Sequence, residues 1–277
     1  MRRQDLSPTS RGGAGLRARR RRADGTAFPA EVAGHARRRG RFARERRGRR
    51  PPARLRSARR GDRRPPLLPR RPSGSAARAA RARFRGLRVA GYPSLWEALV
   101  TAVLSQQVTL RLAFGIRAHL ATAFGRRLRL RKETWIAFPT PQRIARTGER
   151  GLAGFRMSAN KIGTVARLAR AFTSGELSEA KIAALPDELA IERLIEIKGI
   201  GRWTAETALL RSLSRVDSFP AGDLGIVKYL AEGLFEHGRR GTEAEMRAYA
   251  ERWKPWRGLA LVYLWAELAR RSAAASK

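Results

Sequence analysis

The most informative stretch for the fold of this chain is LIEIKGIGRWTAE, at residues 194–206. It predicts two helices joined by a short turn that contains Gly199 and Gly201. Glycine permits positive φ and a close approach of another backbone, and the second helix begins with amide groups that have no partner inside the helix. Such amides suit a phosphate oxygen. The stretch therefore predicts a hairpin that grips a nucleic-acid backbone without reading bases; the alternative is a tight turn with a purely structural role.

The chain around this hairpin, from residue 92 onward, is predicted to be helical. Ser94 with Glu97 and Thr242 with Glu245 match the capping-box pattern that opens helices, and Pro255 ends the second of these helices. No alternating strand pattern of useful length occurs in this part of the sequence. We predict an all-α fold with two helical lobes and a central cleft. Further helices are expected at residues 109–124, 141–147, 159–173, 187–197, 202–214, 224–236 and 257–271.

The N-terminal segment differs in composition from the rest of the chain. The first 90 residues contain 30 arginines, no lysine and 5 acidic residues, and neither a helical nor a strand period runs through them. We predict that residues 1–85 are disordered, that residues 86–271 form the folded domain, and that residues 272–277 are a tail. The segment is either a basic arm that adds affinity for nucleic acid or a mistranslated or misassigned start, because arginine without lysine is typical of GC-rich codons read without a folding constraint.

Composition restricts the classes of function. The formal net charge of +37 favours a polyanionic partner. The absence of cysteine excludes disulfides, thiolate zinc sites and cysteine-bound iron–sulfur clusters, and the three scattered histidines match no metal spacing, so no metal site is expected. The sequence has no run of about 18 apolar residues and no apolar core of a secretory signal. A cytoplasmic location is therefore expected.

A second stretch, DSFPAGDLGIVK at residues 217–228, places Asp223 just before a predicted helix. Taken alone, Asp223 is most simply a helix N-cap. Together, the two stretches resemble the helix-hairpin-helix DNA glycosylases, in which the hairpin is followed by a helix, a loop with Gly and Pro, and an invariant aspartate. The resemblance implies that Asp223 is the catalytic carboxylate, which faces the sugar of a nucleotide rotated out of the duplex. There it stabilises the positive charge that develops on deoxyribose as the base leaves.

Two further stretches, residues 137–143 and 250–257, resemble the bacterial DNA-3-methyladenine glycosylase II type of this superfamily. The similarity covers about residues 92–268. Trp203 stands where the strand-cutting relatives carry a lysine nucleophile, so the resemblance implies a monofunctional enzyme. The absence of cysteine separates the chain from relatives that hold an iron–sulfur cluster. No cofactor is expected, apart from a monovalent cation that the resemblance implies at the hairpin.

The resemblance also assigns a base pocket, a wedge and a contact with the DNA backbone. Trp203 and Trp265 are implied to line the pocket, where an electron-rich ring gains cation–π energy against a cationic base. Thr207 stands where the best-known relative has a pocket tyrosine, and Gln107 matches the residue that wedges into the gap left by the extruded base. The backbone contact is assigned to Lys198, Gly199, Ile200, Gly201 and Thr204. Core packing is the expected role of the remaining tryptophans, which are Trp96, Trp135, Trp253 and Trp256.

The leading hypothesis is hydrolytic removal of alkylated purines, such as 3-methyladenine, from double-stranded DNA in base excision repair, by a monomer associated with a bacterial nucleoid. A cationic base leaves without a strong general acid, which agrees with the lack of an obvious second catalytic group. One alternative is a non-catalytic helix-hairpin-helix DNA-binding protein, although a carboxylate such as Asp223 weakens binding when it faces phosphates. Another is an inactive fragment. The best-known relative has an N-terminal α/β domain that residues 1–85 do not resemble, and the folded part would be inactive if it needed that region for stability.

Overall fold

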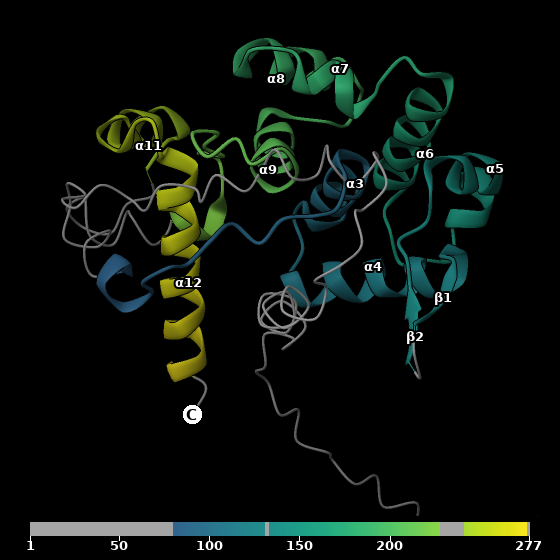
Figure 1. Cartoon of the computed structure of the whole chain (residues 1–277), viewed down its shortest axis with the longest axis horizontal. Coiled ribbons are helices and arrows are strands. Elements are labelled where there is room, and N and C mark those ends of the chain that lie inside the picture. The colour runs from purple at the N-terminus through teal and green to yellow at the C-terminus, as the bar shows by residue number, and fades with distance from the viewer. Residues whose placement is uncertain (1–79, 131–132, 228–240, 276–277) are drawn as a thin grey trace, which may run out of the picture.

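The computed structural model of the chain describes residues 80–130, 133–227 and 241–275, and Figure 1 shows how they are arranged. Helices dominate this part of the chain, and no helix within it combines the length and the apolar character that crossing a membrane requires. The helices are α3 (Leu95–Ser105), α4 (Leu110–Phe124), α5 (Pro141–Leu152), α6 (Ala159–Ser174), α7 (Glu179–Ala183), α8 (Asp187–Ile195), α9 (Arg202–Ser212), α11 (Glu243–Ala250), the 3₁₀ turn η4 (Glu251–Trp253) and α12 (Arg257–Ala275); the strands are β1 (Arg127–Leu130) and β2 (Glu133–Ile136).

The predicted helices are confirmed in position and differ at their ends. α11 gives way to η4 at Glu251 instead of continuing to Pro255, and α12 continues to Ala275, into the residues predicted as a tail. α5 continues to Leu152 through a kink at Gly148, where φ is 65°, instead of ending at residue 147. α8 and α9 each end two residues earlier than predicted, a common difference at fraying helix ends. α7 was not predicted because five residues are too few to show an apolar period. The helix predicted at residues 224–236 begins at Leu224, and its end lies outside the described residues.

Side-chain caps fix the starts of most of the helices, with α8 and α9 as exceptions. At α11, both halves of the predicted capping box are present between Thr242 and Glu245. At α3, Ser94 Oγ accepts a hydrogen bond from the Glu97 amide at 3.2 Å. The Glu97 carboxylate pairs with the Arg117 guanidinium instead of turning back to the cap. The box predicted at Ser94 is therefore only half formed, because a cation is a stronger partner for a carboxylate than a neutral amide.

The predicted all-α fold is confirmed, and the antiparallel pair of β1 and β2 is a small addition to it. Arg127 pairs with Ile136, and Leu130 pairs with Glu133. Each strand is four residues long and the side chains of β2 are exposed, so β2 shows no buried apolar face by which strands are recognised in a sequence. Trp135 lies on β2 with 40% of its surface exposed, and the prediction that it packs in the core is wrong.

Two apolar cores define two lobes, as predicted. The first core gathers buried side chains of α3, α4, α5, α6 and α8, and the second is built by α11, η4 and α12 around the buried Trp253. α9 belongs to both lobes, because Leu209 is buried in the first core and Leu210 in the second. Figure 1 shows α9 between α3 on one side and the α11 and α12 pair on the other. Trp96 is buried and Trp256 packs against the second core, so both have the predicted packing role.

Residues 80–89 pack against the second core. Ala80 is fully buried, and Phe84 and Val89 lie against the same apolar cluster. Arg83 adds an ion pair with Glu267, with 3.6 Å between the charged atoms. The packed chain therefore begins before the boundary that we predict after residue 85. The prediction of disorder for the remainder of that segment falls on residues 1–79, which lie outside the described residues.

Two glycines in helices provide a test of how tightly the second lobe is packed. A Cβ at Gly258 would lie 2.2 Å from the Ser218 carbonyl oxygen, whereas a Cβ at Gly115 meets nothing within 4 Å. Gly258→Ala is expected to lower the free energy of unfolding by about 1–3 kcal/mol. Gly115→Ala, in the exposed middle of α4, is expected to raise it by up to about 1 kcal/mol. Urea denaturation of both variants measures these opposite changes in the free energy of unfolding. Equal changes in the two variants would contradict the packing described for Gly258.

Candidate functional site

The turn of the predicted hairpin is held by a close contact at its first glycine. Gly199 has φ of +100°, and a Cβ there would lie 1.9 Å from Thr164 Oγ1, so this position accepts only glycine without rearrangement. The carbonyl oxygen of Lys198 accepts a hydrogen bond from Arg167 Nε at 3.0 Å. Thr164 and Arg167 both lie on α6, so α6 fixes the position of the turn.

The second glycine of the turn opens toward solvent. Gly201 is the N-cap of α9 in an extended conformation with φ of −96°, and no side chain of the described residues caps this helix. Gly201 is exposed, and a Cβ on it would meet nothing within 4 Å. The first amides of α9 are thus left for an external acceptor, as the sequence pattern predicts.

Asp223 lies beside the hairpin's second helix. Its Oδ1 accepts a hydrogen bond from the Ile226 amide at 3.1 Å, so Asp223 caps the helix that begins at Leu224. Its Oδ2 accepts from Trp203 Nε1 at 3.4 Å. The structure therefore brings together the carboxylate and one of the two tryptophans singled out in the sequence, and both are only partly exposed.

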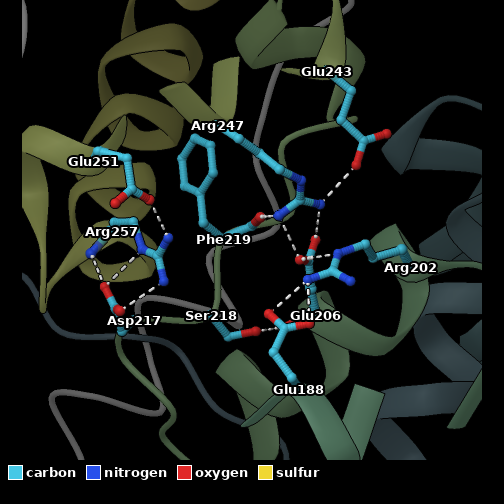
Figure 2. A network of polar contacts seen from close by, with 10 residues as sticks. All are labelled: Glu188, Arg202, Glu206, Asp217, Ser218, Phe219, Glu243, Arg247, Glu251 and Arg257. Atoms are coloured by element: carbon cyan, nitrogen blue, oxygen red, sulfur yellow. Dashed lines mark hydrogen bonds and ion pairs between the residues drawn. The ribbon is translucent and has the colours of Figure 1, made fainter. Parts of the chain in front are cut away.

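A buried carboxylate joins α9 to the loop that carries Asp223 (Figure 2). Glu206 is 2% exposed, and both of its oxygens accept from Arg247, at 2.7 and 3.0 Å. Arg202 Nε adds a third hydrogen bond at 3.1 Å. Arg247 also donates to the carbonyl oxygen of Phe219 at 3.3 Å, within the loop of residues 217–223. Burial raises the pKa of Glu206, while hydrogen bonds and positive charge from Arg247 and Arg202 act in the opposite direction.

A second ion pair holds the start of the same loop (Figure 2). Arg257 contacts both oxygens of Asp217, with Nε to Oδ1 at 3.0 Å and Nη2 to Oδ2 at 2.8 Å. Ser218 Oγ donates to the carbonyl oxygen of Glu206 at 3.1 Å. The loop is therefore fixed at its first residues by α12 and in its middle by α9 and α11, so the position of Asp223 follows from three helices.

Sequence reasoning did not single out Glu206 or Arg247. The signal available for Glu206 was an acidic residue inside a helix that also supplies Leu209 and Leu210 to the two cores. A charge among buried neighbours requires a partner. The identity of that partner could not be deduced, because Arg247 is 41 residues away in the chain.

Two further predicted residues, Gln107 and Trp265, lie on different elements. Gln107 is exposed in the turn after α3, with φ of +54°. Trp265 lies on α12 and packs against the second core; one turn further along α12, Leu268 lies 2.9 Å from the position of a Cβ on Gly225, next to the Asp223 cap.

Thr207 lies on α9, the second helix of the hairpin. It is buried, and its Oγ1 has no hydrogen-bond partner among the described residues. Of the residues assigned to the backbone contact, Lys198 is exposed, whereas Ile200 and Thr204 are buried. Only the exposed positions of the turn can touch an external backbone directly, and the buried ones shape it from within.

Metal binding by side chains finds no support in the described ranges. No group of three or more metal-ligating side chains is placed to hold an ion in residues 80–130, 133–227 or 241–275. The absence of a metal or cofactor therefore stays a prediction from composition.

Residues 100–255 match the profile of HhH-GPD superfamily base excision DNA repair proteins. Two bacterial proteins are similar to the chain. DNA-3-methyladenine glycosylase of Bacillus subtilis is 36% identical over 66% of this chain and 60% of its own length, and DNA-3-methyladenine glycosylase 2 of Escherichia coli is 35% identical over 70% of this chain and 64% of its own. The chain thus spans less than two thirds of each relative.

A solved structure shares the fold. The 3-methyladenine DNA glycosylase of Schizosaccharomyces pombe in complex with abasic DNA superposes with a TM-score of 0.54, at 30% identity, over 66% of this chain and 83% of that one. The likeness covers about two thirds of the chain and supports the two-lobed helical arrangement described above.

The contribution of the buried carboxylate can be measured against an exposed one. Glu206 and Glu188 both pair with Arg202, but the Glu188 side chain is 65% exposed. Glu206→Ala leaves Arg247 and Arg202 without their buried partner and is expected to lower the free energy of unfolding by about 3–5 kcal/mol. Glu188→Ala is expected to cost at most about 1 kcal/mol. Chemical denaturation of the two variants tests the difference, and comparable losses would show that the network of Figure 2 does not hold the loop.

Proposed function

Because the chain belongs to the HhH-GPD superfamily of base excision DNA repair proteins, we propose that it hydrolyses the N-glycosidic bond of alkylated purines, such as 3-methyladenine, in double-stranded DNA. The observation that carries the proposal is the contact of Asp223 with Trp203, 3.4 Å from Oδ2 to Nε1, at the start of the hairpin's second helix. The names of the two bacterial relatives support the class of substrate.

Asp223 acts in this proposal on the sugar. Cleavage of the glycosidic bond makes deoxyribose cationic, and a fixed carboxylate opposite the sugar stabilises that charge and orients water. The Ile226 amide holds Oδ1, and the helix start beside it favours a negative charge. The direction of the carboxylate is therefore set before the nucleotide arrives, so that little reorganisation is required during the reaction.

The extruded base is held by the two tryptophans. Trp203 and Trp265 offer electron-rich faces, and a cationic alkylated base gains about 0.5–2 kcal/mol against such a ring. Thr207 supplies no ring where the best-known relative has a tyrosine. Since an alkylated base is already positively charged, it departs without protonation by a strong acid. Cationic purines are the favoured substrates for these reasons.

The hairpin and the turn after α3 bind the DNA. The open amides of α9 and the exposed Lys198 contact phosphates, and Gln107 fills the gap left by the extruded base. A monovalent cation fits the hairpin, since backbone carbonyl oxygens are suitable ligands for it. The carbonyls of Ile197, Lys198 and Gly199 already accept hydrogen bonds from the Ile200 amide, Arg167 and Gln106, so the ion would share these oxygens with their donors or use that of Ile200.

The product of the proposed reaction is an abasic site. Trp203 occupies the position of the lysine nucleophile in strand-cutting relatives and has no amine with which to form a Schiff base, so the strand is left intact. The enzyme acts as a monomer on damaged double-stranded DNA, in the cytoplasm at the nucleoid. The non-catalytic alternative explains Asp223 as a helix cap, but it gives no role to the second oxygen, which accepts from Trp203 at the start of the proposed phosphate-binding helix.

Replacement of the carboxylate tests the proposal. Asp223→Asn keeps the shape and an acceptor for the Ile226 amide but removes the negative charge. We expect single-turnover excision of 7-methylguanine from duplex DNA to fall by roughly 100-fold or more, with unchanged thermal stability. Asp187→Asn is the matched control, because Asp187 is an exposed aspartate at the start of α8 and neither it nor its partner Arg215 belongs to the proposed site; its excision rate should equal that of the wild type. Undiminished excision by Asp223→Asn would refute the role of Asp223.

The hairpin's contact with phosphate is tested at Gly201. A methyl group there enters the open space in front of α9 without a clash inside the protein. Gly201→Ala is expected to weaken duplex binding by roughly tenfold, the loss of about one charge-assisted hydrogen bond, and to leave the melting temperature unchanged. Gly154→Ala, at another exposed glycine with an open Cβ position, should bind as the wild type does. Fluorescence anisotropy at fixed salt measures both, and equal affinities would place the phosphate contact elsewhere.

A further inference from the structure

The turn between α3 and α4 is tied to the hairpin by one side chain. Gln106 Nε2 donates to the carbonyl oxygen of Gly199 at 3.1 Å and to Thr204 Oγ1 at 3.0 Å. One acceptor belongs to the hairpin turn and the other to the first turn of α9, more than 90 residues away in the chain. Gln106 therefore spans the start of the proposed phosphate-binding helix.

The backbone of the same residue is held by a buried lysine. Lys161 Nζ donates to the carbonyl oxygen of Gln106 at 2.7 Å and to that of Leu104 at 2.9 Å. Lys161 lies on α6 and is only 9% exposed. A cation at this place satisfies the last carbonyls of α3 and interacts favourably with the negative end of that helix. Gln106 is thus fixed by α6 at its backbone and by the hairpin at its side chain.

The next residue is held in an uncommon conformation. Gln107 is exposed and has φ of +54°, a region that costs a residue with a Cβ free energy and persists only where the surroundings impose it. On the N-terminal side of Gln107, the contacts of Gln106 are what can impose this conformation. They direct Gln107 outward at a fixed offset from the open amides of α9.

We propose that Gln106 is a positioning residue, which holds the wedge residue Gln107 in register with the phosphate-binding hairpin so that grip on the strand and insertion into the duplex occur together. The proposal rests on the proposed function. A wedge that is fixed in advance loses little conformational freedom on insertion, whereas a free turn must be ordered each time a base is extruded. Gln106 makes its contribution through Gln107 and does not touch the reacting atoms.

The experiment separates base extrusion from bond cleavage. The full-length wild type, Gln106→Ala, Gln107→Ala and the double variant are compared on a duplex with one 7-methylguanine opposite cytosine, and on the same lesion opposite a tetrahydrofuran abasic analogue, where no pairing opposes extrusion. Excision is followed in single turnover. Extrusion is followed by the fluorescence of a 2-aminopurine next to the lesion. Gln142→Ala, at an exposed glutamine of α5, is the matched control.

We expect Gln106→Ala to slow excision of the paired lesion by about tenfold, which corresponds to about 1.4 kcal/mol, and that of the unpaired lesion by less than about threefold. The double variant should be no slower than Gln107→Ala, because Gln106 acts through Gln107. Equal losses on both duplexes, additive effects of the two substitutions, or an unchanged rate would each overturn the inference.

The fluorescence signal keeps this inference distinct from the proposed function. A wild type that extrudes the lesion but does not cleave it contradicts the proposed function alone, and a weaker extrusion signal for Gln106→Ala then still supports the positioning role. Excision by the wild type with no difference between wild type and Gln106→Ala in either signal contradicts the positioning role alone.

Discussion

The arrangement of the site depends on one buried carboxylate, that of Glu206, between two arginines. A charge that is 2% exposed is costly to bury unless it is paired and hydrogen-bonded, and here Arg247 binds both of its oxygens while Arg202 binds one. This network restricts how α9 and α11 can pack against each other. Movement of α11 away from α9 would separate Arg247 from Glu206 and leave a buried charge unpaired. Through Arg247 and the carbonyl oxygen of Phe219, this constraint extends to the loop that ends at Asp223.

α9 is the element on which the functional features converge. Its first turn presents open amides, its third residue accepts from Gln106, its fifth residue is Glu206, and its second residue, Trp203, faces Asp223. The same helix contributes apolar side chains to both cores. Contact with the DNA backbone, insertion into the duplex and the chemistry at the sugar are therefore proposed to share one rigid reference, which is how a site achieves the small positional tolerance that catalysis requires.

Binding of DNA requires positive charge on the protein, whereas the proposed reaction requires a negative charge close to the same DNA. The chain as a whole is strongly basic, which attracts the polyanion, but the proposed reaction needs a carboxylate close to that polyanion. Oδ1 of Asp223 is bound by an amide at a helix start and Oδ2 by an indole, so neutral donors hold the charge in place. An arginine in either position would pair with the carboxylate and reduce the negative potential available to a cationic sugar.

Features that depend on neighbours along the chain could be predicted from the residues alone. The hairpin with its two glycines, most helix starts, the Thr242 box and the capping position of Asp223 follow from hydrogen bonds and φ preferences that span a few residues. The partner of Glu206, the exposure of Trp135 on the short β1 and β2 pair, and the link from Gln106 to the hairpin became visible in the folded chain alone. The two contacts join residues that are distant in sequence, and all three features depend on which side chains the fold buries and on the cost of removing polar and charged groups from water, which no local pattern specifies.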